Sequence, residues 1–145
     1  MATVAYIPST ASYILTYEYC GSQNCNVWYR IATSPLEFQN AQDYAVYTSA
    51  GTRPSSSPYV VHTTNTKGQP IIIMNAMSSN DLWINNDVVN EYWTTVDVGQ
   101  NAAYSRSILI MDDDGDTRIF LAGAGLFSDS NPQVTVGKVS MVAQG

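Results

Sequence analysis

Residues 59–79 read YVVHTTNTKGQPIIIMNAMSS, which is an apolar strand, a tight polar turn and a second apolar strand. The pattern returns 48 residues later, where residues 108–110 align with 60–62 and residues 118–121 align with 70–73. A repeat of this period, built from strands with almost no helix signal, predicts the blades of a β-propeller. The sequence therefore indicates an all-β fold.

The repeats divide the chain into three expected blades, at about residues 1–52, 53–100 and 101–145. The first blade begins with a looser copy of the pattern, and an irregular link at residues 34–36 precedes its last strand. Alternation of apolar residues and turn residues predicts four strands in each of the first two blades and three in the last. The expected strands are 3–7, 13–19, 26–33, 44–49, 59–64, 70–76, 82–86, 92–98, 105–111, 119–124 and 134–142.

Three blades cannot close a ring, because the first and last sheets would each leave an apolar face in water. Two copies related by a two-fold axis would give a six-bladed ring, so we expect a homodimer that completes the propeller. The alternative is that the sequence is the C-terminal half of a longer chain.

The composition excludes several classes of partner. The chain has 145 residues, of which 45% are hydrophobic and 12% charged, as in one compact all-β domain. Its net charge is −6, so it lacks the positive field that nucleic acids and anionic membranes attract. No apolar run approaches the ~18 residues that span a bilayer. Met1-Ala2-Thr3 lacks signal-peptide features, so we expect a chain that is soluble and either mature or cut at its start.

Cys20 and Cys25 flank a turn-rich spacer between two expected strands. A disulfide there would tie the hairpin and imply an oxidising, extracellular compartment. Two reduced thiols are the alternative. With a single histidine, His62, and no second cysteine pair, we expect no metal site and no cofactor.

The ten tyrosines and three tryptophans, among many Ser, Thr and Asn residues, can stack on flat apolar faces and hydrogen-bond to hydroxyl groups. Sugars offer such surfaces, so a glycan or polysaccharide is the expected partner. The alternative for each aromatic residue is packing between sheets. We expect Trp28 and Trp83 to pack between blades, with Trp83 the better stacking candidate, and His62 to be a core histidine with satisfied hydrogen bonds.

Blades bring the entrance of the first strand and the exit of the second to one face near the axis. The aligned exits carry Glu18, Asn75 and Gly123, where an apolar strand would place hydrophobic residues. Glu18 could act as a general acid or nucleophile, or form a structural ion pair with Arg106. The predicted substrate-binding residues are Tyr19, Ser57, Tyr59, Asn75, Tyr104 and Arg106.

Three stretches, residues 13–19, 54–61 and 103–107, resemble secreted fungal six-bladed propellers with the sialidase-like fold. They are most similar to the exo-acting arabinanases, glycoside hydrolases that release arabinobiose from arabinan. The resemblance implies a secreted protein that corresponds to the C-terminal half of a family member. Members use two carboxylates, and the resemblance assigns Glu18 to one of them, while the other would lie upstream of Met1.

Two functions follow from these observations. The first is a lectin-like protein that binds glycans at the axial face without cleaving them, because glycoside hydrolysis needs a second well-placed carboxylate. The acidic residue on the same face, Asp81, is better explained as a turn residue. The alternative is a retaining exo-glycosidase acting on arabinan-type polysaccharide, with Glu18 as one of its two catalytic carboxylates.

Overall fold

The computed structural model describes residues 2–22, 24–55, 58–64, 70–76, 81–85, 91–97, 106–111, 117–123 and 133–139. In the last three ranges it describes the backbone alone. The elements of the N-terminal third are β1 (Ala2–Ile7), η1 (Pro8–Thr10), β2 (Ser12–Cys20), β3 (Cys25–Ala32), η2 (Pro35–Asn40) and β4 (Tyr44–Ala45). The remaining elements are β5 (Tyr59–Thr64), β6 (Pro70–Asn75), β7 (Asp81–Asn85), β8 (Thr94–Asp97), β9 (Arg106–Met111), β10 (Thr117–Gly123) and β11 (Gln133–Val139).

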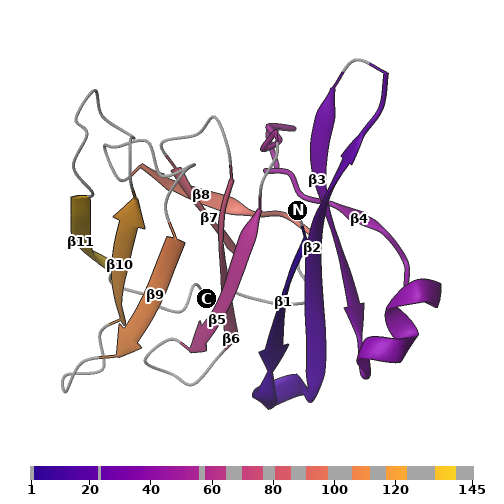
Figure 1. Ribbon diagram of the computed structural model, residues 1–145, viewed down its shortest axis with the longest axis horizontal. Helices are drawn as coiled ribbons and strands as arrows, with labels where there is room; N and C mark the ends of the chain where they lie inside the picture. The colour runs from indigo at the N-terminus through magenta and orange to yellow at the C-terminus, as the bar shows by residue number, and fades with distance from the viewer. Residues whose placement is uncertain are drawn as a thin grey trace.

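The strands form three antiparallel sheets with the strand orders β1-β2-β3-β4, β5-β6-β7-β8 and β9-β10-β11 (Figure 1). Each sheet is a meander in which every strand pairs with the next one along the chain. We call them the first, second and third sheets. The predicted all-β fold of propeller blades is thereby confirmed.

The outermost strands of the first two sheets are shorter than expected. The sequence predicts strands at 44–49 and 92–98, whereas β4 and β8 cover Tyr44–Ala45 and Thr94–Asp97. The backbone just after β4 pairs instead with the backbone just before β8. Tyr47 and Tyr92 form an isolated parallel bridge, and the Trp93 N–H donates to the Tyr47 carbonyl at 2.9 Å. This cross-link joins the first two sheets at their outer edges.

The irregular link predicted at residues 34–36 is the beginning of a short 3₁₀ helix, η2, which has Pro35 as its first residue. Proline suits this position because its fixed φ fits a helical turn and its missing N–H would have no partner there. Within the described residues, no helix is both long and apolar enough to cross a membrane.

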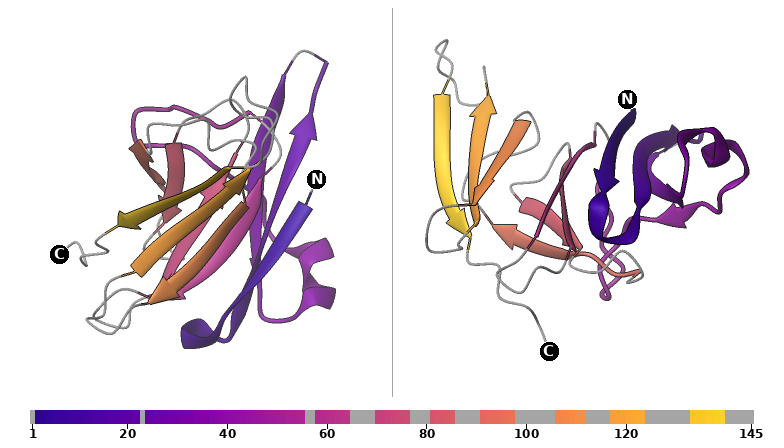
Figure 2. Two further views of the ribbon diagram at one scale, coloured as in Figure 1. Left: turned by 60° about the vertical axis from the view of Figure 1, so that its left-hand side comes forward. Right: turned by 90° about the horizontal axis from the view of Figure 1, so that it is seen from below.

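The three sheets stand in series, with the second sheet between the other two (Figures 1 and 2). Their first strands gather on one side of the molecule, where β5 lies against both β1 and β9. Residues Ile71 to Asn75 of β6 are all at most 2% exposed. In a sheet open to water on one side, burial would alternate along the strand. The unbroken burial of β6 therefore shows that both faces of the second sheet are covered.

The core between the first and second sheets consists of aliphatic and aromatic side chains from both. Trp93 is 1% exposed and its ring meets that of Tyr29 edge to face, with centroids 5.8 Å apart. Tyr29 also stacks on Tyr44, with ring centroids 5.3 Å apart. The cluster contains Ile7, Ile14, Val27, Tyr29, Val46, Val60, Ile72, Met74, Ala76, Trp83 and Trp93.

Candidate functional site

Those predicted site residues that the structure describes lie at one end of the sheets, which we call the axial end. It contains the C-terminal ends of β2 and β6 and the N-terminal ends of β5, β7 and β9 (Figure 1). Antiparallel meanders produce this arrangement, because alternate strands begin and end at the same edge. The expectation that strand exits and entrances from different blades meet at one end therefore holds for the backbone.

Glu18 faces the second sheet. It is the Cα partner of Val27, a fully buried residue of the core between these sheets, and directly opposed residues project from the same face of a sheet. Thr16, two residues earlier on this face, is also fully buried, whereas Glu18 at the axial end is partly exposed. The strand thus carries a carboxylate to the rim of a buried interface. There it can accept hydrogen bonds from sugar hydroxyls or transfer a proton.

Tyr59 and Asn75 are Cα partners at the axial end of the second sheet. Asn75 also pairs with Leu82, so these three residues share a face, and strand alternation makes it the opposite face from the core residues Val60, Met74 and Trp83. Tyr59 and Asn75 therefore border the third sheet. Asn75 is fully buried, and its amide offers both a donor and an acceptor.

The structure consequently divides the predicted site between two neighbouring interfaces. Glu18 lies between the first and second sheets, whereas Tyr59 and Asn75 lie between the second and third. Arg106 begins β9, the strand next to β5, and pairs with Ala122. Its backbone is thus at the axial end, and the ion pair with Glu18 remains a prediction.

Two further predicted binding residues, Ser57 and Tyr104, lie outside the described residues. Gly123 ends β10 at the axial end, as the alignment of strand exits predicts.

Tyr19 does not share a face with Glu18. It follows Glu18 in the same strand, and successive strand residues project to opposite sides of a sheet. Its side chain is 66% exposed, and its partner on β3 is Asn26. Tyr19 and Glu18 therefore cannot contact one sugar ring from the same face of the sheet.

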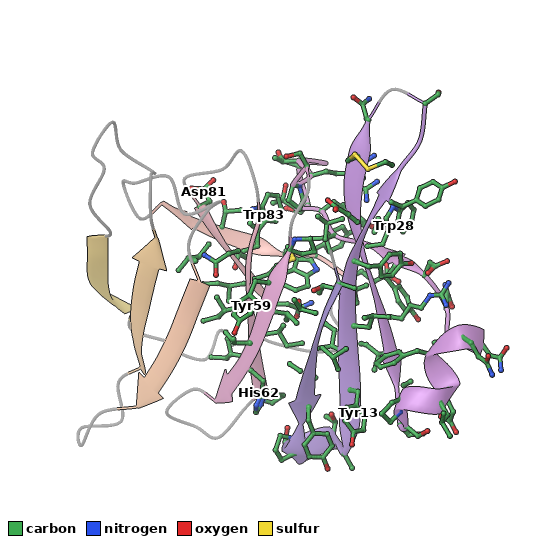
Figure 3. All side chains as sticks on the ribbon, in the orientation of Figure 1. Tyr13, Trp28, Tyr59, His62, Asp81 and Trp83 are labelled. Carbon is green, nitrogen blue, oxygen red and sulfur yellow. A yellow bond between two sulfur atoms is a disulfide. The ribbon has the colours of Figure 1, made fainter. Side chains whose placement is uncertain are left out.

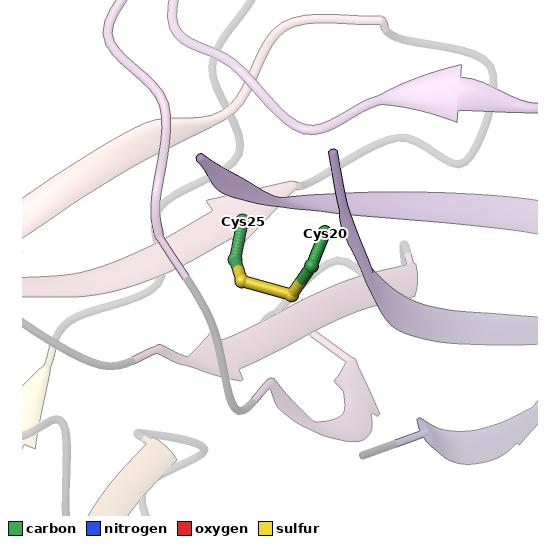
Figure 4. Close-up of a disulfide and its surroundings, with 2 residues drawn as sticks. All are labelled: Cys20 and Cys25. Carbon is green, nitrogen blue, oxygen red and sulfur yellow. A yellow bond between two sulfur atoms is a disulfide. The ribbon is translucent and has the colours of Figure 1, made fainter. Parts of the chain in front are cut away.

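The predicted Cys20–Cys25 disulfide is present (Figure 4). The two cysteines are the last Cα pair of the β2–β3 hairpin, with Cα atoms 3.9 Å apart. The bond closes the hairpin at the axial end, directly after Glu18 and Tyr19. It limits how far these two backbone positions can separate from β3.

One aromatic prediction is confirmed and two need correction. Trp83 is 2% exposed and packs in the core between the first two sheets, as predicted, so it offers no surface for stacking on a sugar (Figure 3). Trp28 lies on the face away from the second sheet, where the Arg53 guanidinium sits 4.8 Å from its ring centroid. His62 is partly buried, but its Nε2 has no hydrogen-bond partner among the described residues, so it is not satisfied as predicted. Burial lowers the pKa of the His62 imidazole.

Asp81 also lies at the axial end, as the first residue of β7, where it is partly buried and precedes Leu82, the Cα partner of Asn75. The sequence explains it as a turn residue because it follows Ser78-Ser79-Asn80, and its place at the start of a strand is compatible with that explanation.

The described residues also form a pocket of about 420 Å³ at the opposite end of the first sheet. It is lined by Ser12, Ile31, Ala32, Thr33, Glu37, Asn40 and Ala41, none of which is a predicted site residue. In the part of the chain that the structure describes, no three His, Cys, Asp or Glu side chains gather closely enough to hold a metal ion.

The chain matches no protein-family profile and no curated protein sequence. Its fold is similar to solved structures of arabinan-degrading enzymes. The α-L-arabinanase of Penicillium chrysogenum, solved in complex with arabinobiose, matches with a TM-score of 0.79 and 25% sequence identity. The GH93 α-L-arabinofuranosidase of Fusarium graminearum, also solved with arabinobiose, matches with a TM-score of 0.75 and 25% identity.

These similarities cover 97% of this chain but only 41% of the Penicillium enzyme and 42% of the Fusarium enzyme. The chain thus spans about two fifths of the length of the enzymes it resembles. The resemblance to exo-acting arabinanases that the short sequence strings predicted is confirmed in the fold.

Proposed function

We propose that this chain forms part of the active site of an arabinan-directed glycoside hydrolase, with Glu18 as one of its two catalytic carboxylates. The observation that carries the proposal is the match of nearly the whole chain to two arabinan-active enzymes, combined with a carboxylate at a strand exit. This interpretation takes precedence over the lectin-like function favoured by the sequence, because the structural neighbours named above are both glycoside hydrolases.

The geometry supports a division of tasks between the side chains. Glu18, partly exposed at the rim of the first interface, would act as general acid or nucleophile at the glycosidic bond. The partly exposed Tyr59 side chain would hydrogen-bond to sugar hydroxyls and orient the ring, and the fully buried Asn75 beside it would support Tyr59 from behind. Retention of configuration requires a second carboxyl group at about 5–5.5 Å from the first. That second carboxyl group would come from another chain or from an N-terminal half upstream of Met1, as in the enzymes of which this chain spans about two fifths.

A glycan-binding protein without turnover is the second candidate. It is favoured by the division of the polar residues between two interfaces, with Glu18 at one and Tyr59 at the other, which would give an extended glycan two points of contact. A carboxylate with neutral polar neighbours can hold sugar hydroxyls even where no second carboxylate is placed for hydrolysis.

The test measures release of arabinobiose from linear arabinan by the purified chain, together with binding of arabinan fragments by calorimetry. We expect Glu18→Gln to retain binding and to lower turnover by about 10²-fold or more. Glu37→Gln is the matched control, because Glu37 is an exposed carboxylate at the pocket at the opposite end of the first sheet and should leave both readings unchanged.

The outcomes separate the two candidates. Turnover that falls in Glu18→Gln but not in Glu37→Gln supports the hydrolase. Binding by the wild-type chain without any product supports the lectin-like function instead. A chain that neither binds nor cleaves arabinan contradicts both.

We also propose that the protein is secreted. The Cys20–Cys25 disulfide supports this, because such bonds persist in oxidising compartments. A polysaccharide substrate would be encountered in the same place.

A further inference from the structure

The face of the first sheet that points away from the second sheet is apolar. We define this outer face by Val4 and Tyr6 of β1, Tyr13, Leu15 and Tyr17 of β2, and Trp28 of β3, which the strand register places together. Val4 is 51% exposed and Tyr6 is 47% exposed. The rings of Tyr6 and Tyr13 meet with centroids 4.8 Å apart.

This distribution is unusual for a sheet face in water. An antiparallel sheet with one solvated face places polar residues there and hydrophobic residues on the buried side. Here the covered side carries the core residues Ile7, Ile14 and Val27, and the outer face is mainly aromatic and aliphatic as well, so both faces of the first sheet are apolar. An exposed apolar patch of this kind marks an interaction site.

The charges beside the outer face are already paired within the chain. Arg30 donates from Nε to Asp43 Oδ1 at 2.5 Å and from Nη1 to the Phe38 carbonyl at 2.7 Å. The Tyr17 hydroxyl donates to the same Asp43 carboxylate. Arg53 stacks on Trp28 and donates to the Val27 carbonyl at 2.8 Å. Covering this face would therefore bury cations that already have their partners.

The order of the sheets indicates what kind of surface fits there. The inner face of the first sheet is covered by β5 and β6 of the second sheet. β9 and β10 of the third sheet repeat the sequence pattern of β5 and β6, and they stand at the far end of the series (Figure 1). The outer face and the third sheet are thus the two ends of the series, which closure of a ring would bring together.

We propose that the outer face docks against the third sheet of a second copy of this chain, and that a two-fold axis closes the ring through two such contacts. A head-to-tail contact of this kind forms a closed assembly when the rotation brings the last subunit back to the first. One copy spans 41% of the similar arabinanase, so two copies come close to its full length. The inference touches the proposed function in one respect: a closed ring would bring the axial ends of two copies, each with its own Glu18, around one axis.

The first measurement is the molar mass of the purified 145-residue chain by light scattering. We expect about twice the monomer mass of 15.8 kDa. The double variant Val4→Glu/Tyr6→Glu should raise the dissociation constant of the dimer by at least ~10-fold over that of the wild-type chain, because it places two carboxylates in an apolar contact. Leu36→Glu is the matched control: Leu36 is 84% exposed on η2, outside the outer face, and its substitution should leave the mass unchanged.

Circular dichroism checks that each variant is folded. Tyr6→Ser, which removes apolar area without adding charge, replaces the double variant if the latter does not fold. A wild-type chain that stays monomeric at its highest soluble concentration overturns the proposal. So does a dimer that Tyr6→Ser and the double variant leave as stable as the wild type.

Failure of this interface is distinguishable from failure of the enzyme function. Arabinobiose release is measured on the same samples. A dimer that the outer-face variants dissociate, but that releases no product, supports the interface and contradicts the hydrolase. A monomer that releases product contradicts the interface alone.

Discussion

The hydroxyl of Thr3 accepts a hydrogen bond of 3.0 Å from the backbone N–H of Val60, which links the innermost strands of the first and second sheets. Strand β5 is the edge of its sheet, and edge strands carry backbone groups that the ladder leaves unpaired. The Thr3 hydroxyl also lies 2.9 Å from that of Thr16, which is fully buried. A short polar contact thus sets the distance between two blades beside the axis.

We predict that Thr3→Val lowers the free energy of unfolding by about 1–3 kcal/mol, because the shape is kept while the Val60 N–H loses its acceptor. Thr3→Ser retains the hydroxyl and should cost less. Urea denaturation followed by tryptophan fluorescence measures both. Equal stabilities for the two variants would show that the hydroxyl contributes nothing at this position.

Packing between the same sheets should depend strongly on Trp93. Its ring is 1% exposed against Tyr29, so Trp93→Ala leaves a large cavity and should cost about 3–5 kcal/mol. Trp28→Ala provides the comparison, since Trp28 is partly exposed and mainly contacts Arg53. We expect it to cost less than half as much in the same denaturation experiment. A larger loss at Trp28 would contradict the assignment of the core.

Reduction of the Cys20–Cys25 disulfide should lower the free energy of unfolding by about 2 kcal/mol, the value expected for a closed loop this short. The bond acts mainly on the unfolded chain, so the reduced protein should keep its β-sheet circular dichroism. The double variant Cys20→Ser/Cys25→Ser is the control, and its urea midpoint should not respond to reductant. An identical midpoint for oxidised and reduced wild-type protein would disprove a stabilising role.

The strands were predictable because apolar runs and turn residues alternate so regularly. β5 has the predicted bounds, Tyr59–Thr64, β6 ends one residue before its predicted end, and β7 is shifted by one residue toward the N-terminus. The prediction was wrong where the backbone of one sheet pairs with that of the neighbouring sheet. No local pattern reveals that Tyr47 pairs with Tyr92 rather than extending β4, since that contact depends on how two blades meet.

The sequence predicted at which end of the sheets the candidate site lies, but not on which face each of its side chains lies. Strand order alone brings Glu18, Asn75 and the backbone of Arg106 to the axial end. The face that each side chain occupies depends on the register of the ladders. Register places Glu18 toward the core between the first two sheets and Tyr59 toward the third sheet. A list of strand exits contains no such information, and it therefore also grouped Tyr19 with Glu18.

His62 should make the stability of the chain depend on pH. Burial lowers the pKa of its imidazole in the folded state. When the pH falls below about 6.5, the imidazole of the unfolded chain is therefore protonated before that of the folded chain. Stability is therefore present at neutral pH and declines as the pH falls through this range, by at most about 1.4 kcal/mol per pH unit. His62 is the only histidine of the chain, which isolates its contribution.

His62→Ile tests this dependence, because the next repeat carries Ile110 at the aligned position. The variant removes a buried Nε2 that has no partner among the described residues, so we expect a gain of about 1 kcal/mol at pH 7.5. The gain should grow at pH 5.5, where only the wild-type chain carries the cost of holding its imidazole neutral. Urea denaturation at the two pH values measures the difference. A gain that is the same at both would mean that the His62 imidazole titrates alike in the folded and unfolded chain.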